Sequence, residues 1–194
     1  MSDPIPRLPR ALDLLAFGFG AGRSPKAPGT VGSAVAVLWF AVFASMPLGF
    51  YLAWVLIAAI AGIAICGEAA RLMGVHDHGG IVWDEFVGQW IALIPLVPML
   101  DWDLRSTLGV LIGFLLFRLF DIWKPWPISW LDKRVHGGFG IMIDDVIAGI
   151  FAAIGLAIGA IGTALAAVVT GFLGLVWWQM PLALLGSVLF ISGP

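Results

Sequence analysis

The sequence predicts an all-α integral membrane protein, a polytopic bundle of about six apolar segments whose polar loops share one face. Of its 194 residues, 61% are hydrophobic and only 11% are charged. Soluble domains carry about 25% charged residues, so a membrane protein is favoured over a globular one. No charged residue occurs between Lys26 and Glu68 or after Asp145. The polar residues instead concentrate in three regions, 18–30, 68–85 and 121–145.

The first two membrane segments come from one uncharged block, Val31 to Gly67. The block is too long for a single crossing, which takes about 17–25 residues. Pro47, Leu48 and Gly49 divide it into segments at about 31–46 and 50–68. The N-terminal stretch before them is proline-rich and charged, which is unlike a cleavable signal peptide.

The remaining segments follow the same logic. The third, 86–100, is short and contains Pro95 and Pro98, so we expect it to be kinked. The fourth spans 106–123, and the last two are expected at about 146–169 and 172–192, divided near Thr170-Gly171. We expect a single membrane domain over 1–194, with 171–192 as an extra C-terminal segment.

This arrangement predicts the topology of the chain. Two segments separate the first polar region from the second, and two separate the second from the third, so all three emerge on one side. Every basic residue except Arg105 lies on or near that side. The positive-inside rule makes it the cytoplasmic face. Regions far apart in sequence can therefore build one site there.

Two similar acidic junctions stand out. Gly80 precedes Asp84-Glu85 by four residues, as Gly140 precedes Asp144-Asp145, and both lead into apolar segments. Acidic side chains are costly beside hydrocarbon and need a compensating function. Carboxylate oxygens are the ligands that hard divalent cations prefer. With Asp121, these acids form the candidate metal site: Asp84, Glu85, Asp121, Asp144 and Asp145.

Basic and glycine-rich elements share this face. The 18–33 stretch has glycines before a helix start, and Lys26, Gly29 and Thr30 there suit a phosphate anion. An entry loop in which Thr30 or Ser33 caps the helix is the alternative. Arg118 and Asp121 are three residues apart and share a helix face. This spacing fits a simple ion pair between them as well as it fits a role of Arg118 in substrate binding. Lys124-Pro125 ends that helix with a cation, whereas Asp132 is expected in a solvated loop.

Acids, bases and a glycine-rich loop together predict a site that holds Mg²⁺ and a phosphate. The hypothesis is metal-assisted hydrolysis of a phosphate monoester, with Arg118, Lys124 and Lys26 neutralising the phosphate. Asp84 or Asp145 would act as a general base or a nucleophile. A divalent-cation transporter and a non-catalytic scaffold remain alternatives. A transporter would use the acids but would not need the basic residues or the glycine loop.

Three strings resemble the signature blocks of the phosphatidylglycerophosphatase A family: PKAPGTVGS, IVWDEFVGQWIAL and FRLFDIWKPWPI…GGFGIMIDDVIAG. The resemblance covers about residues 14–165. It implies a Mg²⁺-dependent phosphatase of the bacterial inner membrane, with its active-site loops facing the cytoplasm, that converts phosphatidylglycerophosphate to phosphatidylglycerol. It also implies catalytic roles for Asp84, Asp145, Arg118 and Lys124. The expected partner is a phospholipid in the membrane, with no nucleic acid and no protein.

Overall fold

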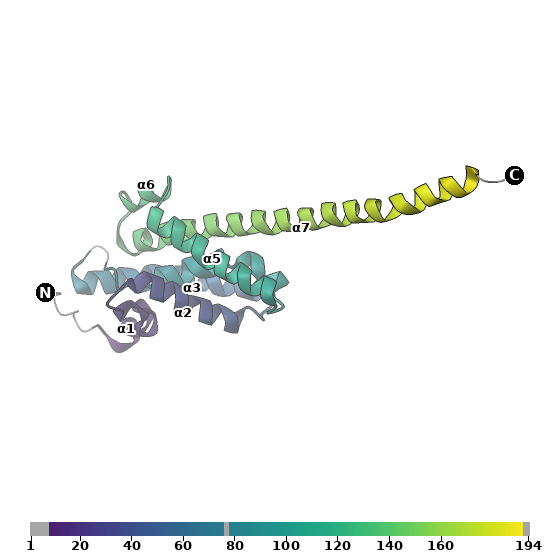
Figure 1. Cartoon of the computed structure of the whole chain (residues 1–194). Coiled ribbons are helices and arrows are strands. Elements are labelled where there is room, and N and C mark those ends of the chain that lie inside the picture. The colour runs from purple at the N-terminus through teal and green to yellow at the C-terminus, as the bar shows by residue number, and fades with distance from the viewer. Residues whose placement is uncertain (1–7, 76–77, 192–194) are drawn as a thin grey trace. The chain divides into compact units, whose positions relative to one another are not determined.

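A computed structural model describes residues 8–75 and 78–191, and side chains as far as residue 171. Within these ranges the chain is helical and contains no strand (Figure 1). It divides into two compact units, Met1–Leu156 and Ala157–Pro194. The acidic and basic residues singled out above belong to the first unit, which is described by itself below.

The N-terminal part contains more structure than an entry loop. Helix α1 covers Arg10–Ala16, and a 3₁₀ helix, η1, covers Gly18–Arg23. Helix α2, Pro28–Phe43, begins after Ala27, whose left-handed φ of 47° turns the chain. Neither Thr30 nor Ser33 caps this helix, because Pro28 already occupies its first position, where a missing N–H costs nothing.

Helix α3 covers Leu48–Met73 and ends at Gly74, whose φ of 69° suits a glycine C-cap. The expected kink in the third segment is confirmed: α4, Trp83–Ala92, gives way to a second 3₁₀ helix, η2, over Ile94–Met99. Helix α5, Leu104–Trp123, starts at Asp103, whose side chain accepts a hydrogen bond from the backbone N–H of Ser106 at 2.8 Å.

Helix α6, Ile128–Asp132, is a single short turn, and α7 covers Gly137–Ile191. The expected division near Thr170-Gly171 is not observed, because α7 continues through both residues. An isolated glycine lowers helix propensity without breaking a helix, which is why this signal was misleading. Similarly, Asp132 lies at the end of α6 rather than in a loop.

Helix α4 is the centre of the first unit. Its two tryptophans tie it to the neighbouring helices: Trp83 Nε1 donates to the Ala58 carbonyl in α3 at 3.1 Å, and Trp90 Nε1 donates to the Ala36 carbonyl in α2 at 3.0 Å. The Tyr51 hydroxyl donates to the carbonyl of Trp90 at 2.8 Å. These buried bonds satisfy the polar atoms of aromatic residues inside an apolar core.

Glycines bring the helices close together. A Cβ atom on Gly88 of α4 would lie 2.5 Å from the Phe117 ring in α5 and 2.7 Å from the Asp145 carbonyl oxygen in α7. Gly67 of α3 meets Gly138 of α7, where an added Cβ would lie 3.1 Å from backbone atoms. Such small-residue contacts are typical of helices packed in a membrane.

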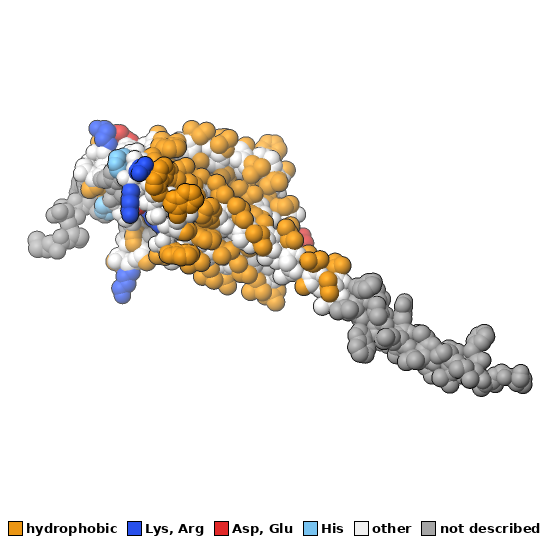
Figure 2. Space-filling view, turned by 90° about the horizontal axis from the view of Figure 1, so that it is seen from above, with side chains coloured by type: hydrophobic (Ala, Val, Ile, Leu, Met, Phe, Trp, Pro, Cys, Tyr) orange, Lys and Arg blue, Asp and Glu red, His pale blue; other side chains and the backbone are white. Residues whose placement is uncertain are grey.

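Among the residues that the structure describes, three helices are long and apolar enough to cross a membrane: Leu48–Met73, Leu104–Trp123 and Gly137–Gly171. Pro28–Phe43 is a shorter apolar helix. Large apolar side chains such as Leu38, Phe50 and Leu115 are exposed, as expected of a surface that faces lipid. On the face drawn in Figure 2, the Lys, Arg and His side chains of the first unit gather at one end.

Candidate functional site

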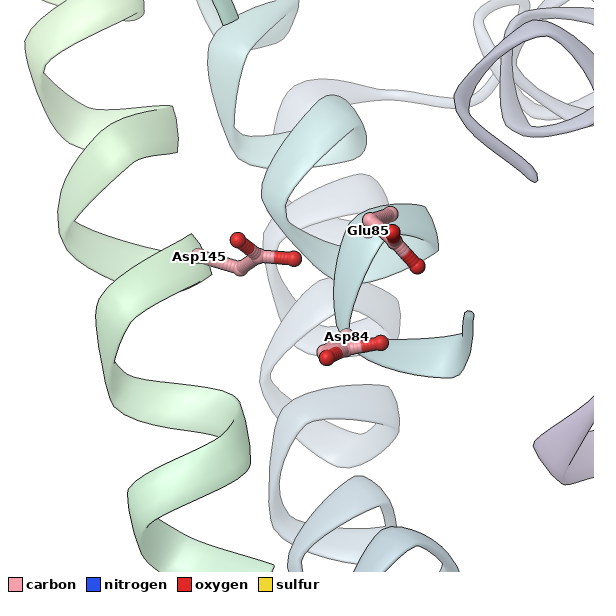
Figure 3. A group of neighbouring side chains, drawn as sticks. All are labelled: Asp84, Glu85 and Asp145. Atoms are coloured by element: carbon pink, nitrogen blue, oxygen red, sulfur yellow. The ribbon is translucent and has the colours of Figure 1, made fainter. Parts of the chain in front are cut away.

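Three carboxylates meet where α4 begins. One oxygen from each of Asp84, Glu85 and Asp145 lies within 4.8 Å of the others. Asp145 projects from α7 toward the first turn of α4, which carries both other acids (Figure 3). Asp84 and Asp145 are buried, at 9% and 3% exposure. The two acidic junctions of the sequence therefore form one cluster.

The packing of Gly88 explains this meeting. Gly88 lies one helical turn beyond Asp84, and its lack of a side chain lets the backbone of Asp145 approach α4.

The first turn of α4 also carries Glu85, which lies outside the three candidate spans. Burial raises the pKa of the Glu85 carboxyl well above its usual value, and the Asp145 carboxylate raises it further. Ionising all the carboxyl groups of this cluster is therefore costly unless a cation compensates their charge.

Arg118 of α5 lies beside the cluster. Its Nη1 is 2.6 Å from Asp121 Oδ2 and 3.9 Å from Glu85 Oε1. The same nitrogen lies 3.4 Å from the Ser33 hydroxyl of α2. The ion pair with Asp121, one of the two alternatives that the sequence left open for Arg118, is thus present. With its side chain 14% exposed, Arg118 is a partly buried cation held between α2, α4 and α5.

One residue of the glycine-rich region, Gly29, lies against the site. Gly29 is buried against Glu85 Oε1, and a Cβ there would lie 3.2 Å from Nη1 of Arg118. Thr30 is half-buried and Lys26 is exposed. Lys26 forms no ion pair with any residue that the structure describes. Of the predicted phosphate-binding residues in this region, Gly29 lies against the acidic cluster.

Lys124 joins three elements. It follows α5 in a left-handed conformation, and its Nζ lies 2.6 Å from Asp144 Oδ2 and 2.8 Å from Asp132 Oδ1. Burial lowers the pKa of Lys124, but the hydrogen bonds to Asp132 and Asp144 raise it by more, so the ammonium stays charged. Asp121 and Asp144 therefore contact cationic side chains and are not among the three clustered carboxylates, although Asp121 also forms a side-chain hydrogen bond with Asp145.

Two further polar residues lie in this region, and neither was selected from the sequence as a site residue. Ser33 is fully buried, and its hydroxyl donates to the Gly29 carbonyl at 3.0 Å. Gln89 is fully buried one turn after Glu85, and its amide has no hydrogen-bond partner among the described residues. Their only sequence signal is a polar side chain inside an otherwise apolar helix.

The donor set fits a hard divalent cation. All three clustered residues offer carboxylate oxygens, with no sulfur or imidazole among them. Oε2 of Glu85 is buried without a hydrogen-bond partner among the described residues. A buried anionic oxygen is costly unless a cation or a donor compensates it. Asp84, Glu85 and Asp145 could thus hold a metal ion.

Comparison with known proteins identifies the family of the chain. The model of the family described as phosphatidylglycerophosphatase A matches residues 14–160 of the chain. This range contains all the site residues described above. No solved structure gives a significant match.

Individual relatives agree with the family match. The chain is 49% identical to the phosphatidylglycerophosphatase A of Escherichia coli (strain K12), over 72% of this chain and 78% of that protein. It is 44% identical to the protein of the same name from Haemophilus influenzae, over 74% and 85%. A protein of Bacteroides thetaiotaomicron named as a putative phosphatidylinositol-3-phosphatase is 38% identical, over 75% and 91%.

Proposed function

The chain belongs to the phosphatidylglycerophosphatase A family, and from this premise we propose that its three-carboxylate cluster is the active site of a phosphatidylglycerophosphatase. The reaction is hydrolysis of a phosphoric monoester: the terminal phosphate of phosphatidylglycerophosphate is released and phosphatidylglycerol remains. The observation that carries the proposal is the convergence of Asp84, Glu85 and Asp145 beside the partly buried cation Arg118.

Asp84, Glu85 and Asp145 would hold Mg²⁺, which supplies Lewis-acid polarisation of the phosphate and lowers the pKa of a bound water. Asp121 and Asp144, the other predicted ligands, contact Arg118 and Lys124 and would act by orienting these cations. Asp84 or Asp145 would accept a proton from the attacking water as a general base.

Arg118 is the principal phosphate-binding residue in this proposal. Its guanidinium is planar and presents several N–H donors, so it can retain Asp121 while it binds phosphate oxygens. Ser33 and Asp121 fix its orientation before substrate arrives. Such preorganised donors stabilise the charge that develops on the phosphate in the transition state. Gly29 lets Glu85 and Arg118 pack closely against the start of α2, because a Cβ there would collide with Glu85 Oε1.

The substrate and the site share the membrane interface. The site lies at one end of the apolar helices, where basic side chains gather (Figure 2), so acyl chains would stay in the bilayer while the headgroup enters from the polar end. The positive-inside rule assigns this end to the cytoplasm. We therefore propose a multi-pass protein of the bacterial inner membrane with a cytoplasmic active site.

The test is phosphate release from phosphatidylglycerophosphate by the purified chain in detergent, with Mg²⁺ and with EDTA. We expect Mg²⁺-dependent release that falls at least about 10²-fold in Asp84→Asn, because a metal ligand is lost. Asp101→Asn, outside the site, is the matched control. Phosphatidylinositol 3-phosphate as a second substrate would reveal a different lipid preference. A folded wild type without activity on either lipid would reject the proposal, and Mg²⁺ uptake into proteoliposomes would then favour the transporter.

A further inference from the structure

Lys124 contacts two carboxylates that differ in burial. The Asp144 side chain is 11% exposed and lies 2.6 Å from Nζ, whereas the Asp132 side chain is 43% exposed and lies 2.8 Å from Nζ. Asp144 lies next to Asp145 on α7, beside the three-carboxylate cluster. Asp132 belongs to the short helix α6 and is not part of either acidic pair, Asp84-Glu85 or Asp144-Asp145.

We propose that Asp132 is a substitute anion: it occupies the position on Lys124 that a phosphate oxygen of the substrate takes when it binds. This inference rests on the proposed function, because it concerns the same site. Lys124 would exchange Asp132 for the phosphate and keep Asp144. Asp132 would thus set the affinity of the site for phosphate groups without contacting the reacting atoms.

The difference in burial decides which carboxylate is exchanged. Ion pairs between exposed side chains contribute little, because water solvates both partners well after they separate. Removing a partner from a buried pair leaves a charge that water cannot reach. Asp132 can therefore return to solvent at low cost, whereas Asp144 cannot. Lys124 itself is 29% exposed, so a ligand can reach its ammonium from the polar end.

The charge of the region explains why an exchange is needed. Lys124 lies between two carboxylates, and Arg118 lies between Asp121 and Glu85, so acids outnumber bases among the described side chains of the site. A phosphate dianion gains little from an ammonium that two carboxylates already neutralise. Once Asp132 leaves, the dianion meets a cation with a single remaining counter-charge.

The test compares wild type, Asp132→Asn, Lys124→Gln and the double variant. The first readout is the apparent affinity for inorganic phosphate, measured by thermal stabilisation in Mg²⁺, which needs no turnover. The second is KM and kcat for phosphatidylglycerophosphate. We expect Asp132→Asn to bind phosphate about two- to five-fold more tightly and to lower KM similarly, as loss of an exposed competing pair predicts. In the Lys124→Gln background the gain should disappear.

Two controls separate this effect from others. Asp101→Asn removes a negative charge elsewhere and should leave phosphate affinity unchanged. Asp132→Ser should reproduce Asp132→Asn if the carboxylate, and not the end of α6, is responsible. Unchanged phosphate affinity in both Asp132 variants, or a gain that persists without Lys124, would overturn the inference. A lower kcat at constant KM would also overturn it, because Asp132 would then only position Lys124. An inactive wild type would instead reject the proposed function.

Discussion

At the scale of single residues, Glu85 carries the clearest electrostatic signature. Its carboxyl is buried near Asp145 and Asp121, and these surroundings hold its pKa well above the ordinary value of 4.5. The folded protein therefore binds this proton more tightly than the unfolded chain does. Without a cation, the stability that the proton provides is complete below that ordinary value and is lost as the pH rises through the raised pKa.

This linkage predicts opposite effects of pH and Mg²⁺. In EDTA, the unfolding temperature should fall between about pH 5 and about pH 8, and Mg²⁺ should restore it most at the higher pH, where the carboxylates are ionised. Mg²⁺ at a hundred times its Kd should add about 2.7 kcal/mol to the unfolding free energy. Thermal unfolding in detergent measures both effects, and Glu85→Gln should weaken them. A stabilising effect of Mg²⁺ that does not depend on pH would contradict the assignment of Glu85 as a metal ligand.

At the scale of helices, close packing around Gly88 brings Asp145 to the acids of α4. Gly88 touches α5 through Phe117 and α7 through the carbonyl of Asp145. This tight packing point lies one helical turn beyond Asp84. The partners of Gly88 were not evident, because a glycine signals close approach without identifying the approaching helix.

Replacing Gly88 by alanine should therefore push α4 away from α5 and α7. We expect Gly88→Ala to lower the free energy of unfolding by about 1–3 kcal/mol, as overpacking does, and to weaken Mg²⁺ binding. Denaturation with and without Mg²⁺ measures both quantities. Gly49→Ala is the matched control, since a Cβ there meets nothing within 4 Å and should leave stability unchanged or slightly raised. Equal effects of the two substitutions would contradict this packing role.

At the scale of the whole chain, the proposed site residues end at Asp145, and the family match ends at residue 160. The apolar sequence continues well beyond both, to the end of the chain. The candidate span that carries Asp144 and Asp145, Gly137–Gly171, is already long enough to cross a bilayer. We therefore propose that residues 171–192 lie outside the catalytic core, as the sequence predicted.

A chain that ends after Gly171 should consequently keep its activity. We expect Mg²⁺-dependent phosphate release within about two-fold of the full-length rate, because every proposed ligand and its packing partners remain. The measurement is the same phosphate-release assay on both chains in detergent. If the shortened chain stays folded but loses activity, residues beyond 171 must contribute to the site.

The sequence by itself predicted the long apolar helices, the all-helical architecture, the kink near Pro95 and the acids and bases that are proposed to carry the chemistry. Composition and charge spacing are local properties, and a hydrocarbon solvent leaves few alternatives to helices. Tertiary structure alone decided how the five acids divide: Asp84, Glu85 and Asp145 cluster, whereas Asp121 and Asp144 contact Arg118 and Lys124. Adjacent acids on a helix point about 100° apart, so only the packing of α4, α5 and α7 assigns each a partner. The contact between Lys124 and Asp132 likewise depends on where α6 lies, which no local pattern encodes.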